Sequence, residues 1–200
     1  MRKVNKIFCK ITFLLFASFA LFSFEAHGKI LFVGNPQSKV TIKVFSSLTC
    51  PACANFHEKI FYKIKEDYID KDLVRFEHHP FPLDLAALNA EIILRCHVDN
   101  SKKFELLGKI YDKQKLWAMG TDIVKINESI KKIGVEFNLK IEDMNNCLKN
   151  DVVQDEILSQ RIEAQKKYKI EATPTIIINE KKYTGKVKYK EFKKALEKNL

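Results

Sequence analysis

The 200-residue sequence predicts an α/β fold in which helices cover a central sheet and a helical subdomain is inserted into the sheet-forming part. Three observations support this prediction. A strand, a helix and a second strand follow one another within residues 40–82, a long helical stretch fills residues 83–166, and strand character returns only near the C-terminus. The economical arrangement of these segments is one sheet built from both ends of the chain.

The first 28 residues have the features of a secretory signal peptide. Basic residues among the first ten positions precede an uncharged apolar run from Ile11 to Phe24, and Ala26-His27-Gly28 forms a small-x-small cleavage pattern. We therefore predict cleavage after Gly28, which also removes Cys9, and export of the mature protein. An uncleaved membrane anchor is the alternative. The apolar run has fourteen residues and, at about 1.5 Å per residue, a helix of this length spans roughly 21 Å. This is less than a hydrocarbon core of about 30 Å, which disfavours the anchor.

Residues 40–45 are rich in β-branched and aromatic side chains, which predicts a buried strand. A helix follows, because apolar side chains recur every four positions, at Phe56, Ile60, Ile64 and Tyr68. The segment "LVRFEHH", residues 73–79, predicts a second strand that two prolines bring to an end. This strand-helix-strand order favours parallel pairing through a right-handed crossover.

The remaining chain divides into a helical block and a short end that contains strands. From Leu83 to about Lys167 the pattern predicts four or five helices. The segment "TPTIIINEKKYTG", residues 173–185, predicts a hairpin, and a closing helix follows it. We therefore divide the mature chain into a sheet-bearing domain at residues 29–82 plus 167–200 and an inserted helical subdomain at residues 83–166.

The formal net charge of +10 does not indicate a nucleic-acid partner. Lysine and arginine are mixed with acidic and apolar positions, and no basic run is long enough to follow a phosphate backbone. A solvated, charged surface is the favoured interpretation, and attraction to an anionic membrane surface stays open as an alternative.

The stretch "SSLTCPACANFH", residues 46–57, places Cys50 and Cys53 at the predicted junction of strand and helix. A thiol reacts as its thiolate, and the free N–H groups and positive dipole end of a helix N-terminus stabilise that charge. Pro51 suits the first helical position, so Cys50 should cap the helix and be the exposed sulfur that attacks or is attacked. Cys53, one turn further on, should pack inward and resolve mixed disulfides.

Two other interpretations of this cysteine pair are weaker. A structural zinc site needs four ligands. Cys50, Cys53 and His57 could share a helix face, but the fourth ligand would have to be His78 or His79. A purely structural disulfide between the two cysteines would close a very small loop and gain little chain entropy. We predict neither a metal nor another cofactor, and we expect His57 to be a packed residue.

Thr173 precedes Pro174 at the start of a predicted strand, where a cis X-Pro bond can provide a tight backbone geometry. This T-P pair follows the C-x-x-C motif by about 120 residues. Together with the helical insertion and the export signal, the two motifs resemble the DsbA family of thioredoxin-fold thiol:disulfide oxidoreductases, in particular its alphaproteobacterial branch. The matching segments are "SSLTCPACANFH", "FPLD", "NNCL" and "TPTIIINEKKYTG", and the similarity covers about residues 33–198.

This resemblance implies a thioredoxin-like fold with Cys50 as the nucleophile, Cys53 as the resolving thiol and Pro174 as a cis-proline that faces them. The supporting residues would be Pro51, Ala52 and Thr173. The resemblance further implies a periplasmic enzyme that oxidises reduced or misoxidised exported proteins and is itself re-oxidised by a quinone-linked, DsbB-like membrane partner. A disulfide isomerase or reductase of the same fold is the main alternative, and a metal-binding or chaperone-like module is a weaker one.

Two positions depart from the family pattern. Ala52 stands where many members carry a histidine that can help to stabilise the first thiolate, so we expect a less strongly lowered pKa at Cys50. Val44 stands where members often carry an acid, six residues before the first cysteine, which can assist proton transfer at Cys53. Valine cannot do so, and we expect proton transfer there to rely on water.

Cys96 and Cys147 lie in the predicted helical block. They could be two separate buried thiols, because free cysteine packs as a small hydrophobe. The even number of cysteines that remains after Cys9 is removed favours a disulfide in an exported chain. Relatives with the same "RC" and "CL" segments are consistent with it, and its expected role is structural.

Overall fold

The computed structural model describes residues 30–200, so the predicted signal peptide and Cys9 lie outside the described residues. The sheet in this part of the chain has five strands in the spatial order β1-β3-β2-β4-β5. The strands are β1 (Leu31–Val33), β2 (Val40–Ser46), β3 (Val74–Pro80), β4 (Thr175–Ile178) and β5 (Lys181–Lys182). None of the helices within residues 30–200 is long and apolar enough to cross a membrane.

Strands from the two ends of the chain meet at β2. It pairs parallel with β3, where Val44 lies opposite His78, and antiparallel with β4, where Val44 lies opposite Ile176. The parallel pair confirms the predicted strand-helix-strand unit, and the antiparallel pairing of β4 with β5 confirms the predicted hairpin. Strand β1, which was not predicted, pairs antiparallel with β3 and forms one edge of the sheet.

The first helix begins at Pro51 and alternates between regular and wider turns. Its segments are α1 (Pro51–Phe56), η1 (His57–Phe61), α2 (Tyr62–Ile64) and η2 (Lys65–Ile69), of which η1 and η2 are π-helical. A strict four-residue apolar repeat exceeds the 3.6 residues per turn of an α-helix, so its stripe would drift around a regular helix. The wider π turns offset this drift. All four residues of the stripe are buried accordingly: Phe56, Ile60, Ile64 and Tyr68.

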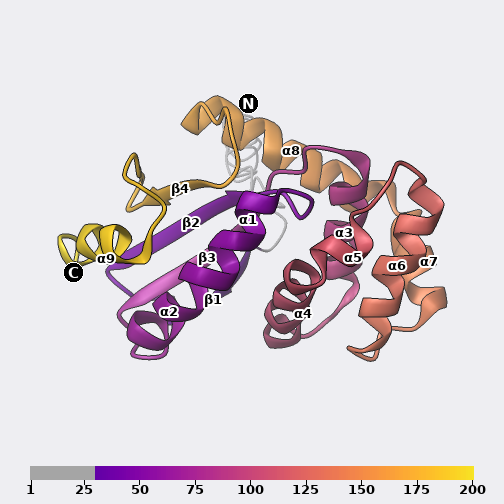
Figure 1. Ribbon diagram of the computed structural model, residues 1–200, viewed down its shortest axis with the longest axis horizontal. Coiled ribbons are helices and arrows are strands. Elements are labelled where there is room, and N and C mark those ends of the chain that lie inside the picture. The colour runs from indigo at the N-terminus through magenta and orange to yellow at the C-terminus, as the bar shows by residue number, and fades with distance from the viewer. Residues whose placement is uncertain (1–29) are drawn as a thin grey trace, which may run out of the picture.

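Six helices lie between β3 and β4, where the sequence predicted four or five. They are α3 (Leu85–Cys96), α4 (Asn100–Asp112), α5 (Gln114–Trp117), α6 (Ile123–Val135), α7 (Ile141–Leu148) and α8 (Asp151–Tyr168). Four of them begin at a side chain that accepts backbone N–H hydrogen bonds, namely Asp84, Asp99, Asp122 and Asn150. Figure 1 shows α3 to α7 gathered to one side of the sheet, while α8 leads back toward β4. The subdomain boundaries at residues 83 and 166 stay predictions.

The sheet and the helical block share one hydrophobic core. Its buried side chains include Ile42 and Phe76 from the sheet, and Leu107 and Trp117 from α4 and α5. The closing helix α9 (Tyr189–Glu197) contributes Phe192 to the same cluster. Because the inserted helices pack directly on the sheet, they can support residues at the end of β2.

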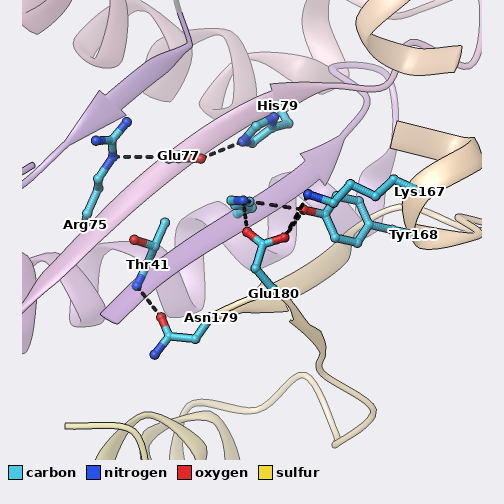
Figure 2. A network of polar contacts seen from close by, with 9 residues as sticks. Thr41, Arg75, Glu77, His79, Lys167, Tyr168, Asn179 and Glu180 are labelled. Carbon is cyan, nitrogen blue, oxygen red and sulfur yellow. Dashed lines mark hydrogen bonds and ion pairs between the residues drawn. The ribbon is translucent and has the colours of Figure 1, made fainter. Parts of the chain in front are cut away.

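A polar network fixes the turn after β4 against β2 and the end of α8 (Figure 2). The Glu180 carboxylate contacts the Lys43 ammonium group and accepts a hydrogen bond from the Tyr168 hydroxyl at 2.7 Å. Next to it, the Asn179 side-chain oxygen accepts a hydrogen bond from the Thr41 backbone N–H at 2.8 Å. These contacts hold the turn after β4 against β2 and against Tyr168, the last residue of α8.

Candidate active site

Cys50 is the N-cap residue of α1. Its backbone is extended, with φ −77° and ψ 118°, and its carbonyl accepts hydrogen bonds from the N–H groups of Cys53 and Ala54 at 3.1 and 3.2 Å. Pro51 occupies the first helical position, where a missing N–H breaks no hydrogen bond. The Ala52 N–H has no helical partner and is available to the cysteine sulfur, which the Cys53 N–H also faces.

The Cys50 sulfur is half-buried and has a strongly lowered pKa. This pKa falls from 9.0 to about 5, chiefly because the Cys53 thiol donates a hydrogen bond to the Cys50 thiolate. Burial opposes the shift, whereas the side chain of Thr173 and the backbone N–H groups of Cys53 and Ala52 add to it. The neutral Cys50 thiol instead donates to the Thr173 carbonyl at 3.3 Å. At neutral pH the thiolate therefore predominates.

Cys53 has the opposite character. Its side chain is 2% exposed. Burial, followed by the hydrogen bond and charge of Cys50, raises the pKa of Cys53 far above its ordinary value. Both cysteines are free thiols in this structure. Because only Cys50 is accessible and ionises readily, it can react with an external sulfur, whereas Cys53 can react only with Cys50.

The Thr173 carbonyl lies 3.3 Å from the Cys50 sulfur, and a cis peptide bond joins Thr173 to Pro174. The Thr173 hydroxyl is buried and has no hydrogen-bond partner, so it is free to donate toward the thiolate. Pro51 and Ala52 are exposed on the first turn of α1. The structure thus brings the predicted site residues together at one end of the sheet.

The active-site loop, residues 47–50, connects β2 to α1. Two residues of the helical block support this loop, and neither was predicted from the sequence. Gln114 is buried and donates hydrogen bonds to the carbonyls of Leu48 and Cys50 at 2.7 and 3.1 Å. Asp84 accepts a hydrogen bond from the Thr49 hydroxyl at 2.7 Å. A single glutamine in a four-residue helix carries no sequence pattern, and only the tertiary fold brings it to Cys50.

The histidines considered as metal ligands make other contacts. His57 is buried, as expected, and stacks on Phe61 with a ring-centroid distance of 4.4 Å. Burial lowers the pKa of His57 to about 3. His78 and His79 contact glutamate carboxylates at 3.0 and 2.8 Å. Within residues 30–200, no group of three or more His, Cys, Asp and Glu side chains is placed to hold a metal ion.

Cys96 and Cys147 form a disulfide with a Cα–Cα distance of 6.1 Å. It joins the last residue of α3 to α7 and spans 51 positions of sequence. Both cysteines belong to the helical block rather than to the thiol pair at α1, so a structural role for this disulfide stays the prediction.

A groove of about 530 Å³ lies next to the first turn of α1. It runs between this helix and the α4–α5 segment, and its walls carry both acidic and basic side chains. Residues on the two walls include Pro51, Asn55, Glu58, Asp112 and Lys115. Its volume is within the range of ligand-binding clefts, so a short polypeptide segment can be accommodated beside Pro51, the residue that follows Cys50.

Comparison with known sequences places these features in a family. A family model described as Thioredoxin matches residues 26–198. Disulfide bond formation protein D of Bacillus subtilis is 32% identical over 178 residues, which cover 84% of this chain and 76% of that protein. A Rickettsia typhi protein described as a protein-disulfide oxidoreductase is 27% identical over 157 residues, or 78% of this chain. The chain spans 57% of the length of this Rickettsia relative.

Solved structures show the same similarity. Wolbachia pipientis alpha-DsbA1 matches with a TM-score of 0.79 and 26% identity, over 86% of this chain and 91% of that chain. BdbD from Bacillus subtilis, in its oxidised form, matches with a TM-score of 0.70 and 24% identity, over 85% and 92% of the two chains, and supports the fold alone. The predicted thioredoxin-like fold with inserted helices is confirmed. The chain belongs to the thioredoxin family, and within it to the DsbA-like thiol:disulfide oxidoreductases.

Proposed function

We propose that this protein is a periplasmic oxidoreductase that introduces disulfide bonds into exported proteins through Cys50 and Cys53. The contrast between the two sulfurs is the observation that supports this function. The pKa of Cys50 is lowered to about 5, whereas Cys53 is buried and its pKa is raised. A thiol of low pKa is a good leaving group. A disulfide that contains Cys50 is therefore readily transferred to a substrate.

The exchange has two steps. A substrate thiolate attacks Cys50, the Cys50–Cys53 bond breaks, and Cys53 leaves with the bonding electron pair and takes up a proton. The substrate is then joined to Cys50 by a mixed disulfide. A second substrate thiolate attacks the substrate sulfur of this bond, and Cys50 leaves as a stabilised thiolate. The substrate loses two electrons in total, and the cysteine pair gains them.

The substrates we propose are reduced or misoxidised exported proteins that are not fully folded. Exposed apolar side chains neighbour residues of the site in sequence. Leu83 and Leu85 flank Asp84, which binds the Thr49 hydroxyl. Leu116 and Met119 follow Lys115, which lines the groove. Unfolded chains expose apolar groups that can contact these side chains. The mixed charges of the groove can bind the polar parts of the same segment.

Each turnover leaves Cys50 and Cys53 reduced, so an electron acceptor must restore the disulfide. We propose a quinone-linked, DsbB-like membrane protein in this role. Its cysteine would form the mixed disulfide with Cys50, and Cys53 would then attack Cys50 and release it.

The redox state of the pair in cells tests the direction of exchange. Acid trapping followed by alkylation should find Cys50 and Cys53 mostly oxidised, and N-terminal sequencing of the protein from a periplasmic fraction should begin at Lys29. The purified oxidised protein should also transfer one disulfide to a reduced, unfolded protein with two cysteines. The Cys50→Ala variant is the control and should transfer none. A mostly reduced pair in cells would instead indicate an isomerase or reductase.

A further inference from the structure

A small cavity lies directly behind Cys53. The space that the centre of a water molecule can occupy in it is about 10 Å³, enough for about one water. Its walls include four side chains that can exchange hydrogen bonds or protons with Cys53: Ser46, His57, His78 and Tyr111. Cys53 must lose its proton before it can attack a mixed disulfide, so these side chains are candidates for the route that the proton takes.

Two of these four side chains are suited to hold a water but not to keep the proton. His57 Nε2 and the Tyr111 hydroxyl are buried and make no hydrogen bond of normal geometry within the protein, although Ser46 is close enough to Tyr111 to oppose the rise in its pKa. Such atoms usually bind ordered water. Burial lowers the pKa of His57 to about 3 and raises that of Tyr111 well above 10.0. His57 therefore remains neutral and Tyr111 remains protonated, and neither group is a suitable acceptor.

Ser46 and His78 continue the polar path away from the cavity. The Ser46 hydroxyl lies 3.3 Å from His78 Nδ1, and His78 Nε2 lies 3.0 Å from a carboxylate oxygen of Glu91. Burial alone would raise the pKa of Glu91, but His78 and Arg95 hold it below its ordinary value. Glu91 is thus an anion and accepts a hydrogen bond from the Nε2–H group of His78. This fixes the tautomer and leaves the Nδ1 lone pair directed at the serine hydroxyl.

His78 also separates the first cavity from a second one. The second cavity is lined by charged residues, including Glu91, Arg95 and Lys103. Arg95 Nε lies 3.6 Å from the other Glu91 oxygen, and the Arg95 side chain is 18% exposed. The polar contacts thus continue from the space behind Cys53, through the buried pair of His78 and Glu91, to a side chain that reaches solvent.

We propose that His78, oriented by Glu91, accepts the proton of Cys53 when this thiol attacks a mixed disulfide on Cys50. The S–H bond of Cys53 breaks, the proton passes through the cavity to Ser46, and the Ser46 hydroxyl proton passes to His78 Nδ1. The thiolate then forms the Cys50–Cys53 bond while the partner's sulfur leaves with two electrons. The imidazolium is paired with Glu91, and the same path returns a proton when Cys53 is released during substrate oxidation.

The inference rests on the proposed function, and one titration separates the two. The reduced protein is mixed with 5,5′-dithiobis(2-nitrobenzoic acid), whose reaction releases a coloured thiolate twice. The first release reports attack by Cys50 and depends on reagent concentration. The second reports attack by Cys53 on the mixed disulfide and does not. The Cys53→Ala variant assigns the phases, because it should show only the first.

His78→Gln and Ser46→Ala should slow the second release at least about 10-fold at pH 7, because general-base catalysis contributes roughly 10²-fold or more. The first release should stay within about twofold. The difference in second-phase rate between variant and wild type should become smaller as pH rises, because hydroxide then takes over the role of the histidine as base. A merely structural defect does not produce this pH profile. His79→Gln is the matched control. His79 neighbours His78 but contacts Glu77 at 2.8 Å and lies outside the cavity, so both phases should be unchanged.

The titratable and charged groups that line the two cavities beside His78 could shape this pH profile: Cys53, His57, Tyr111, Glu91, Arg95 and Lys103. If His78→Gln does not fold, Ser46→Ala decides the question by itself. Second-phase rates within twofold of wild type, or parallel slowing of both phases at every pH, would overturn the proton route. Absence of a second release from the wild-type protein would instead contradict the proposed exchange between Cys50 and Cys53.

Discussion

Replacing Cys53 by alanine should raise the pKa of Cys50 by about one unit. The largest contribution to the pKa of about 5 is the hydrogen bond that the Cys53 thiol donates to the Cys50 thiolate. Hydrogen bonds to charged groups contribute about 1.5–3 kcal/mol, and about 1.4 kcal/mol corresponds to one pKa unit. Because the Cys50 sulfur is only half-buried, solvent screening favours the lower end of this range. The N–H groups of α1 remain and should keep the pKa well below 9.0.

The absorbance of the thiolate at 240 nm between pH 3 and 9 measures this pKa, and the pH profile of alkylation by iodoacetamide gives an independent value. At pH 6 the ionised fraction should fall from about 0.9 in the wild-type protein to about 0.5 in Cys53→Ala. Cys53→Ser is the matched control, because its hydroxyl keeps a donor at the same position. Its Cys50 pKa should stay within about half a unit of wild type. An unchanged pKa in Cys53→Ala, or an equal rise in both variants, would refute the role of this donor.

Three further predictions concern stability measured by urea unfolding. Glu180 has a pKa lowered to about 2, mainly by Lys43. The stability that the ionised Glu180 contributes is fully present above pH 4.5 and is lost as pH falls through about 2. Glu180→Gln should therefore lower the free energy of unfolding by up to about 1 kcal/mol at pH 7 and by much less at pH 2. An equal cost at pH 7 and pH 2 would contradict this. The double variant Cys96→Ala/Cys147→Ala should lose up to about 4 kcal/mol, from the entropy of closing a loop of this length, and an unchanged midpoint would refute the contribution. Trp117→Phe removes the indole N–H, which donates a hydrogen bond to the Ile110 carbonyl at 2.8 Å. The free energy of unfolding should fall by about 1–3 kcal/mol, because the buried carbonyl loses its donor. Equal stability, monitored by circular dichroism, would contradict it.

The sequence was sufficient to predict the parts of the site that depend on local structure. The junction of a buried strand with a helix that begins at Pro51 determines which cysteine is at the N-terminus and which packs inward. These features follow from helix geometry, from the free N–H groups of the first turn and from the conformation of proline. The pairing of β2 with β3 was predictable for a similar reason, since a strand-helix-strand unit favours one crossover.

The supporting contacts could not be predicted, because they depend on how the inserted helices pack. Gln114 reaches the Cys50 carbonyl from α5, across 64 positions of sequence. A buried glutamine has no periodicity of its own, and its two acceptors are backbone carbonyls that every residue possesses. Strand β1 was missed because three residues are too few to show an alternating pattern.

Val44 shows most clearly how register changes the interpretation of one residue. From the sequence, valine at this position indicated only that an acid near Cys53 was missing. In the sheet, Val44 lies opposite His78, so the neighbouring strand places an imidazole beside the same cavity. A shift of β3 by one residue would bring His79 to this face and remove His78 from it, because side chains alternate along a strand. The proton route proposed for Cys53 therefore depends on the parallel register of β2 and β3 as much as on the identity of His78.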